Sequence, residues 1–267
     1  MIDSPTSLAI IVVAGFIAGA INGVVGSGTL FTFSALLAVG LPPVAANGTN
    51  TTGLVAGGFA SSYAYRAELR NRLKSLRWAI VGTAIGACLG ALLVVSLPEE
   101  VFATVVPWLI ALATVMVALA PLRTRVTARL TPRHGRAVGV NAAAVPESGH
   151  VNQRALWPWT GAVGIYGGYF GAAQGVVLMA VLTWIYDARV QYSNAAKNLF
   201  ASIANMMAAF VFIFAGYVVW PAALSLMASS TLGGYLGARW ARRLPEVVLR
   251  GMVIAVGVIA TTVLVVG

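Results

Sequence analysis

The sequence repeats itself, which limits the folds open to it more than any other feature. At a shift of 147 residues, Gly82 to Ala91 falls on Ser229 to Ala238, and Leu97-Pro98-Glu99 falls on Leu244-Pro245-Glu246. Further upstream the shift is 145, and there Gly19, Gly23 and Gly26 coincide with Gly164, Gly168 and Gly171. A duplication of this length predicts two copies of one structural unit.

The composition predicts that both copies lie in a membrane. Hydrophobic residues make up 59% of the 267 residues and charged residues only 9%, which is far outside the range of soluble domains. Four apolar runs approach or reach the length of a transmembrane helix, namely Trp78 to Leu97, Phe102 to Ala120, Trp220 to Ala238 and Gly251 to Val266. We therefore expect an all-α, polytopic membrane protein.

The basic residues predict the orientation of the two copies. Of the 17 Lys and Arg residues, 16 lie in four connections, which are Arg66 to Arg77, Arg123 to Arg154, the short one at Arg189, and Arg239 to Arg250. The connections near Pro42, Pro98 and Tyr217 carry none. The positive-inside rule makes the four basic connections cytoplasmic and both termini external. Matching segments then cross in opposite directions, so the repeats are inverted. This placement also argues against nucleic acid as the partner of the +10 net charge.

We expect three parts: a first repeat over residues 1–121, a basic cytoplasmic linker over 122–155, and a second repeat over 156–267. Each repeat would contain a glycine-broken hairpin, Leu8 to Gly40 or Trp157 to Tyr186, and three transmembrane helices. The pieces on either side of Gly171 are about 14 and 13 residues long, too short to cross 30 Å of hydrocarbon comfortably. This favours a re-entrant hairpin. The piece before Gly26 is long enough to span, so a spanning first hairpin stays an alternative.

The two hairpin tips are the candidate substrate site. A helix that starts at mid-membrane directs its free N–H groups and the positive end of its dipole at the membrane centre, where two such starts could hold an anion. The predicted tip residues are Gly26, Ser27, Gly28, Thr29, Gly171, Gln174 and Gly175. The alternative is that these glycines only allow close helix packing, as we expect for Gly82, Gly86, Gly90, Gly233 and Gly237.

Two polar trios, each at the start of the helix that follows a hairpin, complete the predicted site. They are Asn47, Asn50 and Thr51 in the first repeat, and Asn194, Lys197 and Asn198 in the second. Their i, i+3, i+4 spacing puts each trio on one helix face. Amide and hydroxyl donors would replace water around an oxyanion, and Lys197 would supply the countercharge. The alternative for Lys197 is that its side chain snorkels to the cytoplasmic surface.

Other chemistries are not expected. All seven carboxylates lie near segment ends or in connections, so the usual intramembrane proton relay is missing. The first tip has no Walker lysine, His134 and His150 have no clustered partners, and Cys88 is the only cysteine. We therefore expect no enzyme activity, cofactor or metal. The expected partners are a small anion and the lipid bilayer, and a homo-oligomer is compatible with the sequence.

The paired hairpins GAINGVVGSGTLF and GIYGGYFGAAQGV, followed by ANGTNTTG and SNAAKNLF, make the chain resemble the TauE/SafE family of sulfite exporters, grouped with the toluene sulfonate uptake permeases. The resemblance implies a multi-pass carrier of sulfite, sulfoacetate or a related sulfur-containing anion in the bacterial inner membrane. The tips depart from the usual GxGGG pattern. The predicted function is export of a small sulfur oxyanion bound between the tips. A passive anion channel, an uptake permease for a related anion and a non-transporting membrane subunit are the alternatives.

Overall fold

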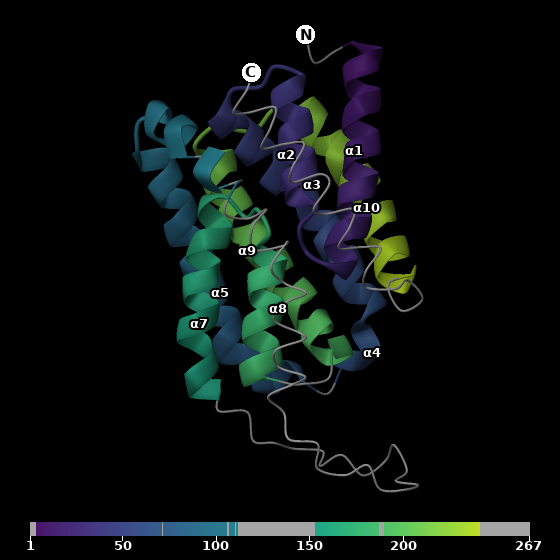
Figure 1. Ribbon diagram of the computed structural model, residues 1–267, viewed down its shortest axis with the longest axis vertical. Helices are drawn as coiled ribbons and strands as arrows, with labels where there is room; N and C mark the ends of the chain where they lie inside the picture. The colour runs from purple at the N-terminus through teal and green to yellow at the C-terminus, as the bar shows by residue number, and fades with distance from the viewer. Residues whose placement is uncertain are drawn as a thin grey trace, which may run out of the picture.

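The computed structural model describes residues 4–70, 72–105, 107–109, 111, 153–186 and 190–240. Over these residues the chain is helical and contains no strand, which confirms the all-α prediction (Figure 1). The N-terminal half contains α1 (Pro5–Val24), α2 (Thr29–Ala38), α3 (Pro43–Ala64), α4 (Arg66–Leu69) and α5 (Leu73–Ser96). The C-terminal half contains α7 (Gln153–Tyr169), α8 (Gln174–Ile185), α9 (Val190–Phe214) and α10 (Trp220–Trp240). Residues 99–105, after α5, are also helical.

Part of the predicted organisation falls outside the described residues. The expected span Gly251 to Val266 lies wholly outside them, and Phe102 to Ala120 lies partly outside them. The same holds for most of the linker predicted over 122–155. Helix α7 begins at Gln153, four residues before the expected start at Trp157, so the last three residues of that linker range are helical.

The distribution of side chains is that of a protein whose surroundings are apolar. Large hydrophobic side chains face outward, such as Phe214 at 87% exposure and Leu232 at 63%, whereas Asn50 and Thr52 are buried. Soluble proteins show the opposite preference for their polar side chains. Among the described residues, three helices are long and apolar enough to cross a membrane: α1, α5, and residues Gln191–Phe214 of α9. These observations describe a polytopic membrane protein.

Both long apolar segments break at the predicted glycines. Gly26 has φ +88° and Gly171 has φ +73°, a backbone region that favours glycine. Each turn contains the same type of hydrogen bond. The N–H of Gly26 donates to Ile21 O and the N–H of Gly171 donates to Tyr166 O, each at 3.2 Å. After the turns, α2 has 10 residues and α8 has 12, or roughly 15 and 18 Å at 1.5 Å per residue. Neither can cross a bilayer alone, whereas α1, with 20 residues, is long enough to do so.

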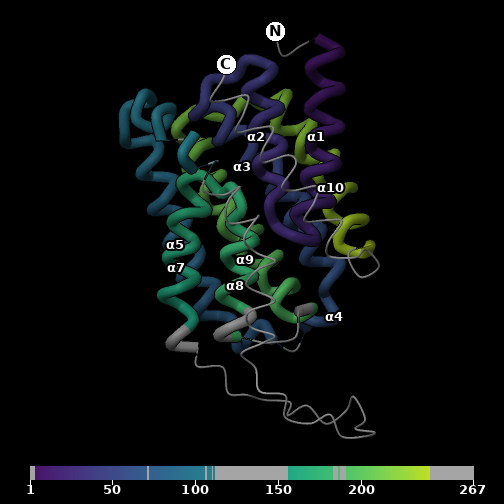
Figure 2. Tube along the Cα trace, viewed as in Figure 1, coloured from purple at the N-terminus to yellow at the C-terminus, as the bar shows by residue number. Residues whose placement is uncertain are grey.

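The first helix of each hairpin packs against a helix of the other half. Helix α1 lies beside α10, and α7 lies beside α5, with α3 and α9 between the two pairs (Figure 1). Helices α3 and α9 are antiparallel, because Gly48 lies against Phe212 at one end of the pair and Tyr65 meets Asn194 at the other. In Figure 2 the α1–α2 hairpin descends from the top and the α7–α8 hairpin rises from the bottom. Their turns therefore meet near the middle of the molecule.

Glycine makes the two cross-half pairs possible. A Cβ on Gly86 of α5 would collide with the carbonyl oxygen of Gly161 in α7, and a Cβ on Gly233 of α10 would collide with that of Phe16 in α1. A Cβ on Gly237 would likewise collide with the backbone of Ala20. These contacts confirm the packing role predicted for these glycines.

Replacing Gly86 with alanine is expected to destabilise the α5–α7 pair. The new methyl group would collide with backbone atoms, which cannot rotate away as a side chain can. We therefore expect the free energy of unfolding to fall by about 1–3 kcal/mol, as in overpacked cores. Gly161→Ala is the matched control in the same interface, because its Cβ would make an ordinary 3.5 Å contact with Gly82 O. Thermal unfolding in detergent, followed by tryptophan fluorescence, measures both. Equal midpoints for the two variants would contradict the prediction.

Candidate functional site

The two hairpin tips touch each other. The N–H of Gly175, at the start of α8, donates to the carbonyl oxygen of Gly26 at 3.0 Å. A Cβ on either glycine would overlap the backbone of the other. The tip side chains beside this contact, Ser27 and Gln174, are each only 3% exposed. The structure thus brings the two predicted tips together in the interior.

In the first tip, a side chain from α1 takes part in the turn. The N–H of Gly28 donates to Asn22 Oδ1 at 2.7 Å, so one of the free amides expected at the start of α2 is already bound. The carbonyl oxygen of Thr29 accepts from Asn50 Nδ2 at 3.2 Å. A Cβ on Gly28 would collide with Ala18 O, so this position requires glycine because the chain passes close to α1.

The second tip uses a different arrangement for the same turn. The N–H of Gln174 donates to Gly171 O at 3.2 Å, and the hydroxyl of Tyr166 donates to the carbonyl oxygen of Ala172. Ala173 adopts a left-handed conformation with φ +55°. The Gln174 side chain covers Gly167, the position that corresponds to Asn22 in the first tip. Each tip therefore holds one carboxamide, supplied by opposite arms of the hairpin.

The trio on α9 holds the carboxyl end of α1. Lys197 Nζ donates to Asn22 O at 3.1 Å, and Asn198 Nδ2 donates to Gly23 O at 3.1 Å. Asn194 Nδ2 donates to Gly23 O at 3.4 Å and to the Tyr65 hydroxyl at 2.8 Å. The last carbonyl groups of a helix lack partners within the helix and carry its negative dipole end, so donors and a cation are favourable there. All three side chains reach the same end of α1, as their spacing predicted.

Lys197 does not snorkel. Its side chain is 1% exposed, and its Nζ bonds inward to α1 instead of reaching the cytoplasmic surface, so that alternative is wrong. Among the described residues no carboxylate forms an ion pair with it. The three described carboxylates are Glu68 on α4 and Glu99 and Glu100 after α5, and none is fully buried. An unpaired ammonium in an apolar interior is costly unless an anion accompanies it.

The trio on α3 divides its contacts between the two hairpins. Asn47 Nδ2 donates to Tyr169 O, the last carbonyl of α7, at 3.0 Å. Asn50 bonds within the first hairpin, accepting from the Thr32 hydroxyl and donating to Thr29 O. Thr51 is buried at 5% exposure. Asn47 and its repeat equivalent Asn194 thus make equivalent contacts. Each donates a hydrogen bond to the first hairpin helix of the other half.

The amide donors of these trios are bound to protein groups in this structure. Asn47, Asn50, Asn194 and Asn198 all donate to backbone carbonyl oxygens. Five buried donors lack a partner among the described residues, namely the hydroxyls of Ser27, Ser34, Thr52 and Thr83 and the amide nitrogen of Gln174, and two of them lie at the tips. Ser27 Oγ and Gln174 Nε2 are buried and have no hydrogen-bond partner among the described residues. Both are donors, and they flank the Gly26–Gly175 contact.

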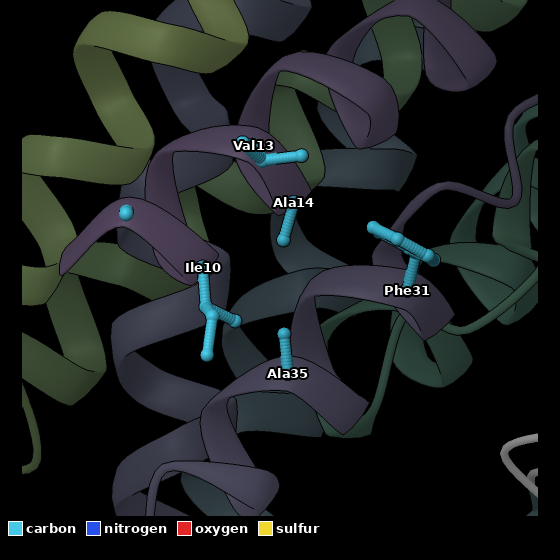
Figure 3. Close-up of a pocket in the computed structure, with 6 residues that line it drawn as sticks. Ile10, Val13, Ala14, Phe31 and Ala35 are labelled. Atoms are coloured by element: carbon cyan, nitrogen blue, oxygen red, sulfur yellow. The ribbon is translucent and has the colours of Figure 1, made fainter. Parts of the chain in front are cut away.

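A separate pocket lies between α1 and α2, away from this polar cluster. It has a volume of about 340 Å³ and is lined by Ala9, Ile10, Val13, Ala14, Phe31 and Ala35 (Figure 3). All six are apolar, and none belongs to a tip. Ile10 and Val13 are 45% and 57% exposed, so the pocket opens on the outer face of the molecule. It offers nothing that would bind an anion. Within the described part of the chain no cluster of three His, Cys, Asp or Glu residues could hold a metal.

Sequence reasoning missed Asn22, Tyr65 and Tyr166, which all bond to the tips or to the side chains that hold them. Asn22 carried a usable signal, because it is the one amide in the apolar segment Pro5–Val24. Comparison of the two repeats did not point to Asn22, because the equivalent residue in the second copy is Gly167, which has no amide side chain. Tyr65 acts through a contact with Asn194, 129 positions away, and Tyr166 bonds to a turn residue six positions on, so neither residue type marked its role in the sequence.

Broken helices that meet in a buried polar centre, inside an apolar outer surface, define a multi-pass membrane transporter. Comparison with known proteins agrees with this class. The family described as "Sulfite exporter TauE/SafE" matches residues 11–264, and the chain belongs to this family.

Curated relatives over nearly the whole chain are named as transporters. The "Probable membrane transporter protein ORF9" of Sinorhizobium sp. is 30% identical over 94% of this chain and 89% of its own length. The "Probable membrane transporter protein" of Haemophilus influenzae is 24% identical, over 95% and 92%. The "Probable membrane transporter protein YfcA" of Escherichia coli K12 is 24% identical, over 96% and 88%. No solved structure matches the chain.

Proposed function

We propose that this chain is a secondary transporter that exports a small sulfur-containing oxyanion, such as sulfite or an organosulfonate, from the bacterial cytoplasm. The anion would bind at mid-membrane between the two hairpin tips. The single observation that carries the proposal is the pair of buried, unpartnered donors beside the tip contact, Ser27 Oγ and Gln174 Nε2. A buried donor without an acceptor costs about 1–3 kcal/mol, and oxyanion oxygens would remove that cost.

Charge supports the same conclusion. Lys197 is buried without a carboxylate partner among the described residues, and its Nζ bonds to Asn22, whose side chain holds the start of α2. A cation in this position stabilises a nearby anion strongly, because little water is present to screen it. The tip glycines Gly26, Gly28, Gly171 and Gly175 would form the closely packed turns that hold this site, with Thr29 and the two trios around them.

The arrangement of the halves supports a carrier mechanism. We propose that the halves are inverted repeats, with both termini outside and the basic connections in the cytoplasm. Two hairpins that enter from opposite sides and meet halfway provide one central site that can be reached from each side in turn. For an anion that leaves a negative cytoplasm, the membrane potential contributes roughly 2.3 kcal/mol per charge per 100 mV in the direction of export.

Flux measurements test the proposal. Purified protein in proteoliposomes is expected to show saturable sulfite efflux and counterflow, because a carrier must return its site to the starting side. Flux that does not saturate would indicate a passive channel instead. No flux of sulfite, thiosulfate or a sulfonate by correctly folded protein would contradict the proposal and favour a non-transporting subunit.

A further inference from the structure

Two buried acceptors accompany the two free donors at the site. Asn47 Oδ1 and Asn194 Oδ1 have no hydrogen-bond partner among the described residues, although both side chains are buried, at 1% and 6% exposure. They occupy equivalent positions in the two repeats. Each lies next to a hairpin turn, since Asn194 bonds to Gly23, three residues before Gly26, and Asn47 bonds to Tyr169, two residues before Gly171.

The hydrogen bonds of these two amides show that the unpartnered atom is the oxygen and not the nitrogen. The amide nitrogen of Asn47 donates to a carbonyl oxygen, and so does that of Asn194. A carbonyl oxygen cannot donate, so rotating either amide by 180° would place two acceptors face to face. The unpartnered atom in each repeat is therefore an acceptor, and it can be satisfied only by a ligand or water that brings a hydrogen.

The charge of the site limits the ligand further. Lys197 is the one fully buried cationic side chain in the described part of the chain, and no fully buried carboxylate lies there to offset it. A singly charged anion neutralises this ammonium. A doubly charged anion would leave a net negative charge in an apolar interior, which is costly.

We propose that the transported species is a protonated oxyanion, a monoanion that keeps one O–H group, of which hydrogensulfite is the simplest sulfur example. Its oxygens accept from Ser27 Oγ and Gln174 Nε2, and its hydroxyl donates to the oxygen of Asn47 or Asn194. This inference rests on the proposed function and narrows its substrate, because a sulfonate has no such hydroxyl. The substrate would then carry its own proton, which fits a chain whose carboxylates all lie near segment ends or in connections.

The test compares hydrogensulfite with methanesulfinate, in which a methyl group replaces the hydroxyl at the same charge and similar size. Initial efflux from proteoliposomes is measured at one mildly acidic pH, after subtraction of the leak through protein-free liposomes. A site built to bond a substrate hydroxyl rejects the analogue that lacks it, because the acceptor is left unpaired. We expect hydrogensulfite to be transported at least about tenfold faster than methanesulfinate.

Variants locate the acceptor. In the double variant Asn47→Leu, Asn194→Leu the ratio of the two fluxes is expected to fall toward one. Asn50→Leu is the matched control, since Asn50 is an equally buried amide one turn away whose oxygen and nitrogen are both bonded within the protein. It should lower both fluxes and leave their ratio unchanged. Taking the ratio within one preparation removes differences in the amount of folded protein.

The outcomes separate the two proposals. A wild-type ratio near one, with saturable flux of both anions, overturns the protonated-substrate inference and leaves the proposed transport function standing. Saturable flux of neither anion overturns both. A ratio that collapses equally in Asn50→Leu overturns the role given to Asn47 and Asn194. If the double variant does not fold, the wild-type ratio alone decides.

Discussion

Replacing Lys197 with methionine is expected to reduce anion flux by about 100-fold while leaving the protein folded. The substitution keeps an unbranched side chain, one atom shorter than that of lysine, and removes the only fully buried cation among the described residues. Removing one partner of a buried ion pair costs about 3 kcal/mol, which corresponds to roughly 100-fold in anion flux. The protein itself loses one bond, from Nζ to Asn22 O, but also loses a buried charge that has no carboxylate partner in the described part of the chain. Thermal stability without substrate should therefore stay the same or rise.

The chain provides its own control for this experiment. Lys74 is the only other lysine, and it is exposed at the start of α5, so Lys74→Met should leave flux unchanged. Proteoliposome efflux and thermal unfolding are measured on both variants. Unimpaired flux in Lys197→Met would remove Lys197 from the mechanism, and a large loss of stability would give it a purely structural role.

The substitution Gly26→Ala is expected to separate the two tips, with a large loss of both stability and flux. Its Cβ would overlap the Cα of Gly175, and backbone on both sides prevents relaxation. We expect the free energy of unfolding to fall by about 1–2 kcal/mol because alanine disfavours the left-handed conformation, and by about 1–3 kcal/mol more because of the collision. Flux should fall at least tenfold, because Ser27 and Gln174 flank this contact.

The variant Gly40→Ala is the control that separates the effect of the collision from the effect of backbone strain. Gly40 has φ +90°, close to that of Gly26, but a Cβ there would meet nothing within 4 Å. The variant Gly40→Ala should therefore lose only the 1–2 kcal/mol of backbone strain and keep its flux. Equal losses of stability in the two variants, or normal flux in Gly26→Ala, would show that the tip contact does not matter for transport.

The sequence predicted the hairpins because their causes are local. Gly26 and Gly171 interrupt apolar segments, and the piece that follows each is too short to cross a bilayer, so a turn inside the membrane was the consistent solution. The span expected over Trp220 to Ala238 also covers nearly all of α10, Trp220–Trp240, because its apolar run ends at Arg239.

The polar trios show where this reasoning stops. Their spacing correctly placed Asn194, Lys197 and Asn198 on one face, but spacing does not identify what lies opposite that face. The structure puts the carbonyl oxygens of Asn22 and Gly23 there, so the trio binds a helix end that belongs to the other half. At the tips, the donors of Ser27 and Gln174 stay free because the neighbouring residues form their hydrogen bonds with other groups.

The sequence by itself determined that this chain is helical, that it lies in a membrane and where its helices break, because apolar length, charge placement and glycine act on their own segment. Only the tertiary structure decided that α1 packs on α10 and α7 on α5, that Gly26 meets Gly175, and which buried polar atoms lack partners. These are contacts between residues about 150 or more positions apart or, for α7 on α5, about 75 apart, and they depend on how complete helices fit together. Because glycines recur in several helices, the sequence allows several pairings of helices, and the packing of the whole molecule selects one of them.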